Sequence, residues 1–252
     1  MSHVPVSVSA DDELPSDVQE KKFLYYSLHT LCMEPTLHPR VKICCISSIQ
    51  EAWCAVTHGA SALGLVSHMP SGPGVIPEDC IARIARIVPP SVGTFLLTSY
   101  RDSHTIIKQQ HRTGVNTIQL CDRLESSAYP LLQAHLPGIS LVQVIHITGK
   151  EALEEACRIA SSVHALLLDS GNPALPIKEL GGTGRIHDWT ISRKIRESVD
   201  IPIFLAGGLN PNNIRTAIHA VAPFGVDVCS GVRTNGHLDP SKLDTFFRNS
   251  AL

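Results

Sequence analysis

Two residues that directly follow apolar runs could take part in acid–base chemistry. Asp169 ends the run ALLLD and is followed by the long segment GNPALPIKELGGTGRIHDW. Burial at such a place raises the pKa of a carboxyl group and suits it to act as a general acid. Cys44 lies two residues after Lys42, and a nearby cation favours the thiolate form that acts as a base or nucleophile. The alternative for Cys44 is a small buried side chain. Because neighbours along a strand point to opposite faces, we expect only one of Cys44 and Cys45 to face the interior.

Glycine-rich turns predict a second kind of chemistry, the binding of an anion. Gly207 and Gly208 lie in LAGGLNPNN, and Ser230 and Gly231 lie in DVCSGVR. Glycine lets backbone N–H groups approach an anion closely. The glycines of either turn alone could simply allow the chain to turn tightly. Two such turns that lie side by side would predict a phosphate site.

The segment after Asp169 is long for a connection between a strand and a helix, which usually has about 2–6 residues. It contains Gly181-Gly182-Thr183-Gly184, and no Gly-Lys-Ser/Thr follows, so it is not a Walker A loop. We therefore expect Gly182, Thr183 and Gly184 to form a mobile cover over a bound ligand.

The elements that must position these residues alternate regularly. Short runs rich in Val, Ile and Leu predict eight strands, at Val41–Ile46, Ala62–Val66, Ser91–Thr98, Asn116–Leu120, Ser140–Ile147, His164–Asp169, Ile201–Ala206 and Gly225–Cys229. Amphipathic stretches predict helices at Ile49–His58, Glu78–Val88, Asp102–Arg112, Leu124–His135, Lys150–Ala160, Asp188–Val199, Pro211–Val221 and Pro240–Asn249. Such alternation implies parallel strands joined by right-handed crossovers.

This pattern predicts an α/β protein, a (β/α)8 TIM barrel over residues 41–252 with an N-terminal extension over residues 1–40 that is partly disordered. Asn210-Pro211 and Asp239-Pro240 are expected to begin helices. An open doubly wound sheet is the alternative, but no G-x-G-x-x-G follows the first strand. In a barrel, the strand ends that carry Cys44, Asp169 and the glycine-rich turns would share one face, with the turns after strands seven and eight at the usual phosphate position.

Composition limits the partners. The 252 residues include 21 Lys and Arg and 23 Asp and Glu, which is not the basic surplus of a nucleic-acid or membrane-surface binder. No stretch predicts a transmembrane helix, and the acidic N-terminus does not resemble a signal peptide. The eight cysteines include no C-x-x-C pair, and the histidines show no spacing typical of a metal site. We expect a cytoplasmic protein with neither metal nor cofactor, and make no prediction of its oligomeric state.

The motifs, taken in order, resemble those of the phosphoribosylanthranilate isomerase family from Val41 to about Phe247. The family motifs K-I-C-G-I-T, L-L-D, G-G-T/S-G with F-D-W, L-(A/S)-G-G-L-N-P-E-N-V and P-F-x-V-D-V-S-S-G-V-E correspond here to Lys42–Ser47, Leu167–Asp169, Gly181–Gly184 with His187–Trp189, Leu205–Ile214 and Pro223–Arg233. The resemblance implies an aldose–ketose isomerase of tryptophan biosynthesis that needs no cofactor. N-(5-phosphoribosyl)anthranilate would undergo an Amadori rearrangement to an aminodeoxyribulose phosphate. Asp169 would protonate the ring oxygen, and the Cys44 thiolate would remove the C2 proton.

The sequence departs from this family at the anthranilate end. Pro73 stands where the family has an arginine that holds the anthranilate carboxylate, and Arg185 and Arg233 are the candidates to replace that arginine. Cys45 replaces a glycine, and Cys121 and Asp122 replace the last two residues of Q-L-H-G. Two alternatives therefore stay open: an isomerase acting on another phosphosugar, and a barrel that binds a phosphosugar without turnover.

Overall fold

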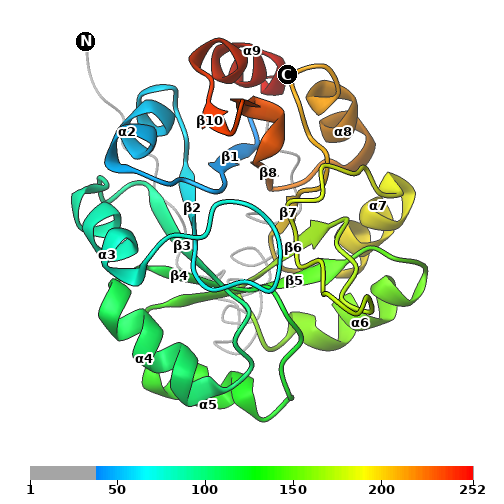
Figure 1. Cartoon of the computed structure of the whole chain (residues 1–252). Helices are drawn as coiled ribbons and strands as arrows, with labels where there is room; N and C mark the ends of the chain where they lie inside the picture. Colours follow the sequence, from blue (N-terminus) through cyan, green and yellow to red (C-terminus); the bar gives the residue numbers. More distant parts are fainter. Residues whose placement is uncertain (1–37, 252) are drawn as a thin grey trace, which may run out of the picture. The chain divides into compact units, whose positions relative to one another are not determined.

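The computed structural model describes residues 38–251, and its centre is a closed barrel of eight parallel strands (Figure 1). The strands are β1 (Arg40–Ile43), β2 (Ala62–Val66), β3 (Gly93–Thr98), β4 (Thr117–Leu120), β5 (Ser140–His146), β6 (Ala165–Asp169), β7 (Ile203–Leu205) and β8 (Gly225–Val228). Each strand pairs with its sequence neighbour, and β1 closes the barrel by pairing with β8 from Arg40↔Gly225 to Ile43↔Val228. The predicted barrel is confirmed, and the open sheet is excluded. Almost all of the predicted extension lies outside the described residues.

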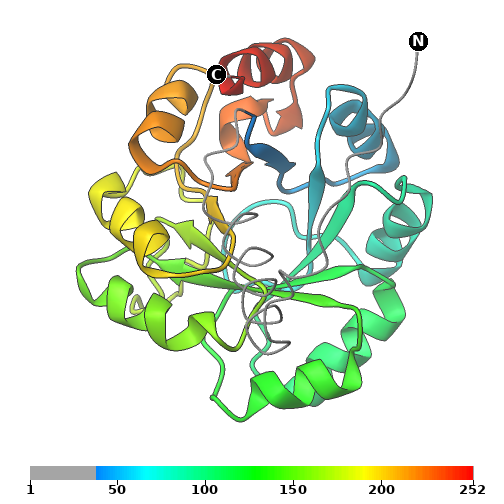
Figure 2. The same cartoon turned by 180° about the vertical axis from the view of Figure 1, so that it is seen from behind.

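Helices surround this barrel, as both views show (Figures 1 and 2). They are α2 (Ile49–Thr57), α3 (Glu78–Ile87), α4 (Ser103–Thr113), α5 (Ala128–His135), α6 (Glu151–Ala160), α7 (Trp189–Ser198), α8 (Ile214–Val221) and α9 (Pro240–Ser250). A short 3-10 helix, η1 (Ser230–Val232), follows β8, and a small ribbon of β9 (Arg233–Thr234) and β10 (His237–Leu238) precedes α9. Within residues 38–251 no helix combines the length and apolar character needed to cross a membrane.

The alternation of side chains along each strand creates two apolar layers. In β6, Leu166 and Leu168 join the core between the strands and the helices, whereas Ala165 and Leu167 join the core inside the barrel. Both sets are buried, which is why the strands read as continuous apolar runs rather than as alternating ones. The interior core is filled from several strands and continues to residues that follow the strand ends, such as Cys44, Cys121 and Ala206.

The two residue pairs that were predicted to begin helices, Asn210-Pro211 and Asp239-Pro240, differ in the structure. Asp239 caps α9 as predicted, because its side chain accepts hydrogen bonds from the N–H groups of Ser241 and Lys242. The prediction that Asn210-Pro211 begins a helix is wrong, since α8 begins at Ile214. The Asn210 side chain accepts from Asn212 N, and Asn213 Oδ1 accepts from Asn210 N, at 2.9 and 2.8 Å. These local bonds hold residues 210–213 in a turn and delay the helix.

Candidate active site

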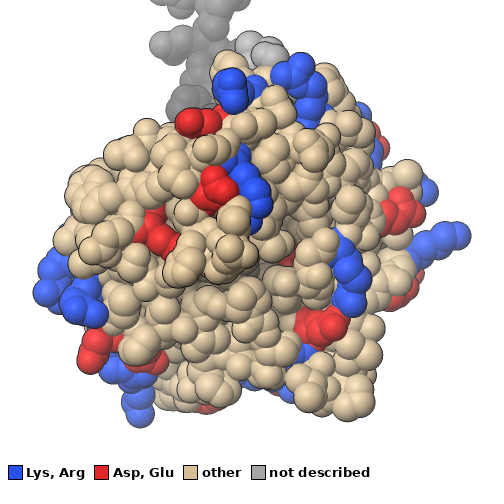
Figure 3. Space-filling view, turned by 45° about the horizontal axis from the view of Figure 1, so that its top comes forward, with Lys and Arg blue, Asp and Glu red and all other residues tan. Residues whose placement is uncertain are grey.

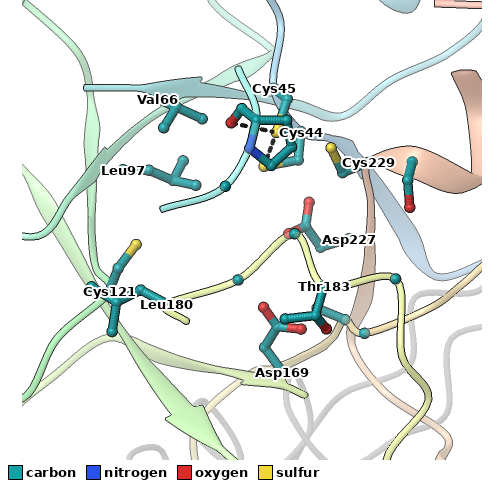
Figure 4. A pocket seen from close by; sticks show the side chains of 18 of the residues that line it. Cys44, Cys45, Val66, Leu97, Cys121, Asp169, Leu180, Thr183, Asp227 and Cys229 are labelled. Atoms are coloured by element: carbon teal, nitrogen blue, oxygen red, sulfur yellow. Dashed lines mark hydrogen bonds between the residues drawn. The ribbon is translucent and has the colours of Figure 1, made fainter. Parts of the chain in front are cut away.

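A cavity opens at the C-terminal ends of the strands (Figure 4), which is where barrel enzymes place their active sites. Its lining comes from the ends of β1 to β4 and β6 to β8 and from the loops that follow β2 and β6. It includes all but one of the predicted site residues: Cys44, Asp169, Gly182, Thr183, Gly184, Gly207, Gly208 and Ser230. Gly231 is the exception and lies behind the lining.

The turns after β7 and β8 pack so closely that only glycine fits. Gly207 and Gly208 have φ of 83° and 63°, which is the left-handed region. A Cβ on Gly208 would lie 2.7 Å from Arg185 C, and a Cβ on Gly231 would lie 2.0 Å from Leu209 O. The two turns therefore touch each other and the loop after β6, and this contact brings their backbones together at one corner of the cavity.

Asp169 ends β6 and is buried beside the cavity. Its Oδ1 accepts a hydrogen bond from Ser170 N at 2.7 Å, and its Oδ2 lies 2.9 Å from the position that a Cβ on Gly181 would occupy. Burial raises the pKa of Asp169, against smaller opposing effects of the Ser170 bond and His146. This is the direction that the sequence predicted, and it suits the protonated carboxyl of a general acid.

Cys44 follows β1, and its N–H donates to Val228 O at 2.8 Å. The thiol of Cys44 and the ammonium of Lys42 are neighbours, since Sγ and Nζ lie 2.8 and 3.1 Å from the Cβ position of Gly64. Lys42 is fully buried and pairs with Asp227 Oδ1 at 2.9 Å. Burial acts to lower the pKa of Lys42, but the charges of Asp227 and Cys44 outweigh it and raise that pKa. A permanent positive charge therefore stands beside the thiol.

Cys45 corrects one sequence-based expectation. Cys44 and Cys45 do not point to opposite sides; both line the cavity, and their sulfur atoms lie 3.9 Å apart. The strand has already ended at Ile43, and Cys45 has a φ of +60°, so the alternation of a strand no longer applies. A glycine at this position of the family motif was the signal for a left-handed residue.

A family model, a sequence relative and a solved structure all identify the same family. The family model for N-(5'-phosphoribosyl)anthranilate isomerase matches residues 41–249. The chain is 34% identical to N-(5'-phosphoribosyl)anthranilate isomerase 2 of Methanosarcina mazei over 209 residues, which cover 82% of this chain and 92% of that one. The crystal structure of phosphoribosyl anthranilate isomerase from Thermotoga maritima matches with a TM-score of 0.73 and 28% identity, over 84% of this chain and 98% of that one.

The chain belongs to the N-(5'-phosphoribosyl)anthranilate isomerase family. It is thus an intramolecular aldose–ketose isomerase of tryptophan biosynthesis. A further member of the family, 26% identical with a TM-score of 0.70 over 84% of this chain and 98% of that one, was solved in complex with reduced 1-(o-carboxyphenylamino)-1-deoxyribulose 5-phosphate.

Two loops meet over the isomerase cavity. Ser71 Oγ, from the loop after β2, donates to Lys178 O in the loop after β6 at 2.6 Å. Pro73 Cδ lies 2.7 Å from the Cβ position of Gly182, and Pro73 O accepts from Cys45 Sγ at 3.7 Å. Gly182 has a φ of 69°, so it reaches this contact in a conformation that favours glycine. The residues predicted to form a cover therefore contact a second loop, and that contact involves a glycine and a proline.

Cations are absent from the lining. Among residues 38–251 the cavity is lined by no Lys, Arg or His. Arg233 binds Glu51 at 2.7 Å and donates to Cys45 O at 2.6 Å, and Arg185 pairs with Glu179. Both arginines named as replacements for the family arginine are therefore engaged elsewhere.

On the face drawn in Figure 3, acidic and basic side chains are interspersed rather than gathered into one basic patch.

Several residues that line the cavity were not predicted as site residues, although Cys121 was noted as a departure from the family. Gln119 and Cys121 come from β4 and the residue after it, and Asp227 and Cys229 come from β8 and its end. Asp227 could have been found from the sequence. It is the one ionisable side chain of β8, and a charge in a buried strand needs a partner. No group of three or more His, Cys, Asp or Glu side chains within the described residues is placed to hold a metal ion.

Proposed function

We propose that this isomerase converts N-(5-phosphoribosyl)anthranilate to the aminodeoxyribulose phosphate with Asp169 as the general acid and Cys44 as the general base. One observation supports this division of roles above all. The two groups line the same cavity, but Asp169 is a buried carboxyl whose pKa is raised, whereas Cys44 lies beside the permanently charged ammonium of Lys42. Opposed environments of this kind are what an acid and a base working at one pH require.

The rearrangement moves protons without any net change in composition. Asp169 donates its proton to the furanose ring oxygen as the bond from that oxygen to C1 breaks, which leaves a Schiff base between C1 and the anilino nitrogen. The Cys44 thiolate then takes the proton from C2, and the electron pair of that C–H bond forms an enolamine. Tautomerisation of the enolamine gives the ketone at C2, and proton exchange restores both side chains.

The phosphate group is proposed to bind at the corner formed by Gly207, Gly208, Ser230 and Gly231. Support comes from the contact between the two turns and from the usual place of phosphate in barrel enzymes, which is after strands seven and eight. Thr183 would close this corner, since its hydroxyl is bonded to Ser170 Oγ at 2.8 Å beside Asp169. Gly182 and Gly184 belong to the same cover.

The anthranilate carboxylate is proposed to bind without a cation. A guanidinium bound to a carboxylate is worth about 1.5–3 kcal/mol more than no partner, so its loss should raise KM roughly 10- to 100-fold relative to a family member that has the arginine. A cytoplasmic location is proposed as well. That compartment would keep the free thiols of the cavity reduced.

Exchange of the two proposed catalytic residues tests this function. Cys44→Ala and Asp169→Asn should each lower kcat by roughly 10² or more, the scale of general acid–base catalysis. Cys157→Ala, at an exposed cysteine of α6, is the matched control and should leave kcat unchanged. Because Asp169 must be protonated, kcat should also fall as the pH rises past its raised pKa. A mild Cys44→Ala beside an inactive Cys45→Gly would reverse the choice of cysteine.

Growth of a tryptophan auxotroph that lacks this isomerase tests the substrate. The wild-type chain should restore growth, and the Asp169→Asn variant should not. Failure of the wild-type chain to restore growth, although it is expressed and folded, would favour another phosphosugar or a barrel without turnover.

A further inference from the structure

Within residues 38–251, four free thiols line the catalytic cavity, and three of them gather at one side. Cys44 and Cys45 follow β1, and Cys229 follows β8, the strand that pairs with β1. Figure 4 shows Cys229 facing the Cys44 and Cys45 pair, with Cys121 on the other side of the cavity. The proposed mechanism uses only Cys44, so the neighbouring thiols need their own explanation.

Cys45 and Cys229 are the pair in position to react with each other. Both side chains line the cavity on the same side, and the segments that carry them are held together directly. Cys44 N donates to Val228 O at 2.8 Å, and Arg233 Nη2 donates to Cys45 O at 2.6 Å. These bonds fix the end of β1 against the end of β8, so little backbone movement is needed to bring the two sulfurs together.

A bond between Cys44 and Cys45 is geometrically unfavourable, although their sulfurs are 3.9 Å apart. Disulfides join residues whose Cα atoms are about 4.4–6.8 Å apart, whereas consecutive Cα atoms are about 3.8 Å apart. Beyond the last register pair, Ile43↔Val228, Cys229 follows opposite Cys44 and is diagonal to Cys45. With neighbouring strands about 4.8 Å apart and a rise of about 3.3 Å per residue, a diagonal pair has a Cα separation of about 5.8 Å, which lies within the favourable range. The partner available to Cys45 is therefore across the strand pair.

We propose that Cys45 and Cys229 form a peroxide-sensitive thiol pair, which hydrogen peroxide converts to a disulfide that shuts the catalytic cavity reversibly. The Cys229 thiolate attacks one peroxide oxygen, the O–O bond breaks, and one water leaves with a proton from solvent. The Cys45 sulfur then attacks the sulfenic acid on Cys229, its S–O bond breaks, and a second water leaves. Two thiols are thereby oxidised, and one peroxide is reduced to two waters.

The surroundings assign the roles of attacking and resolving thiol. The neighbouring Cys45 thiol lowers the pKa of Cys229 despite its burial, with further help from Arg233 and Lys42. The pKa of Cys45 is raised by Cys229, by Cys44 and by burial. Cys229 is also the less buried of the two, so it is the thiol that a small oxidant in the cavity meets as thiolate.

Closure of this bond would disturb the catalytic residues on both sides. The two sulfurs must approach to about 2.05 Å, which draws Cys45 toward Cys229. Cys45 is next to the base Cys44, and Cys229 is next to Ser230. The base and one side of the phosphate corner would shift together. Oxidation should therefore lower kcat/KM at least 10-fold, and a dithiol reductant should restore it.

The experiment treats the full-length chain with hydrogen peroxide, alkylates the remaining thiols and maps the peptides without reduction. The expected product is a peptide pair joined through Cys45 and Cys229, lighter by two hydrogens than the sum of its parts, formed in step with the loss of activity. Cys45→Gly and Cys229→Ser, which carry the residues of the family motifs, should retain activity before treatment and form no such pair. Neither should recover fully with reductant, because the Cys44 thiol of the cavity, no longer protected by the pair, is then oxidised further. Cys157→Ser, at the exposed cysteine on α6, is the control and should behave like the wild type.

Detection of sulfinic acid on Cys44 while Cys45 and Cys229 stay free would overturn the proposal. So would reversible inactivation of both variants at the wild-type rate. The peptide map does not depend on turnover, so an inactive chain that forms the disulfide would count against the proposed function and leave the thiol pair intact.

Discussion

The ion pair between Lys42 and Asp227 offers a quantitative test of how the active site is supported. The two side chains meet at 2.9 Å with 0% and 9% of their surfaces exposed. At an effective dielectric constant of about 20, unit charges at that separation attract each other by about 6 kcal/mol, most of which offsets the cost of removing them from water. Removal of one partner leaves the other charged and buried, so Lys42→Met and Asp227→Asn should each destabilise the fold by about 3–5 kcal/mol.

The double variant decides whether these losses come from the pair. Because Lys42→Met combined with Asp227→Asn leaves no unpaired charge, its destabilisation should be clearly smaller than the sum of the two single losses. Urea unfolding monitored by circular dichroism measures all four free energies of unfolding. A single variant that does not fold, beside a double variant that does, supports the same conclusion. Losses that simply add would refute the view that the pair acts as a unit.

Activity provides a second measurement on the same set. The double variant should fold but remain slow, since it lacks the positive charge beside Cys44. If the double variant recovered wild-type kcat along with its stability, Lys42 would have a structural role only.

Three further perturbations follow from individual contacts. Burial lowers the pKa of His187 to about 4. Between about pH 6.5 and 4, His187 therefore takes up a proton only in the unfolded chain. This residue should lower the stability of the wild type by about 2 kcal/mol from pH 7 to pH 5. His187→Phe should abolish that part of the decrease in urea titrations, and an unchanged slope would contradict the assignment. Gly208→Ala should weaken binding of inorganic phosphate in calorimetry, whereas Gly114→Ala, with a similar φ of 66° but nothing within 4 Å, should cost stability without changing phosphate affinity. Pro73→Arg should lower KM for the anthranilate substrate roughly 10-fold or more if it forms a charge-assisted pair with the carboxylate, and an unchanged KM would indicate that no carboxylate is bound near residue 73.

The fold could be predicted from the sequence because every strand is buried on both faces. Runs such as the one that ends at Asp169 carry no interruption by polar residues, and this is the pattern of a parallel barrel. The ends of the elements were less predictable, since they depend on local side-chain bonds. Asn210 and Asn213 bond to neighbouring backbone groups, and a sequence pattern does not distinguish this turn from a helix cap.

The sequence predicted which residues meet at the cavity where backbone geometry decides, but not where side-chain directions decide. The glycines after β7 and β8 were recognisable because no other residue fits their contacts. The direction of Cys45 was not, because it depends on one residue with φ of +60° just beyond the strand. The engagement of Arg233 by Glu51 was also hidden, because these residues are 182 positions apart and meet only in the closed barrel.

This division also explains how the substrate contacts can diverge within a constant fold. Where the turns after β7 and β8 meet, a Cβ on Gly231 would lie 2.0 Å from a backbone oxygen, so a substitution there would move the backbone at the ends of two strands. On another side of the cavity, Leu97 and Cys121 form the lining through their side chains. Exchange of such side chains alters what the cavity recognises without moving the barrel. A change of substrate in this isomerase is therefore expected on the side of the cavity that such side chains form, where no cation from the described residues enters the lining.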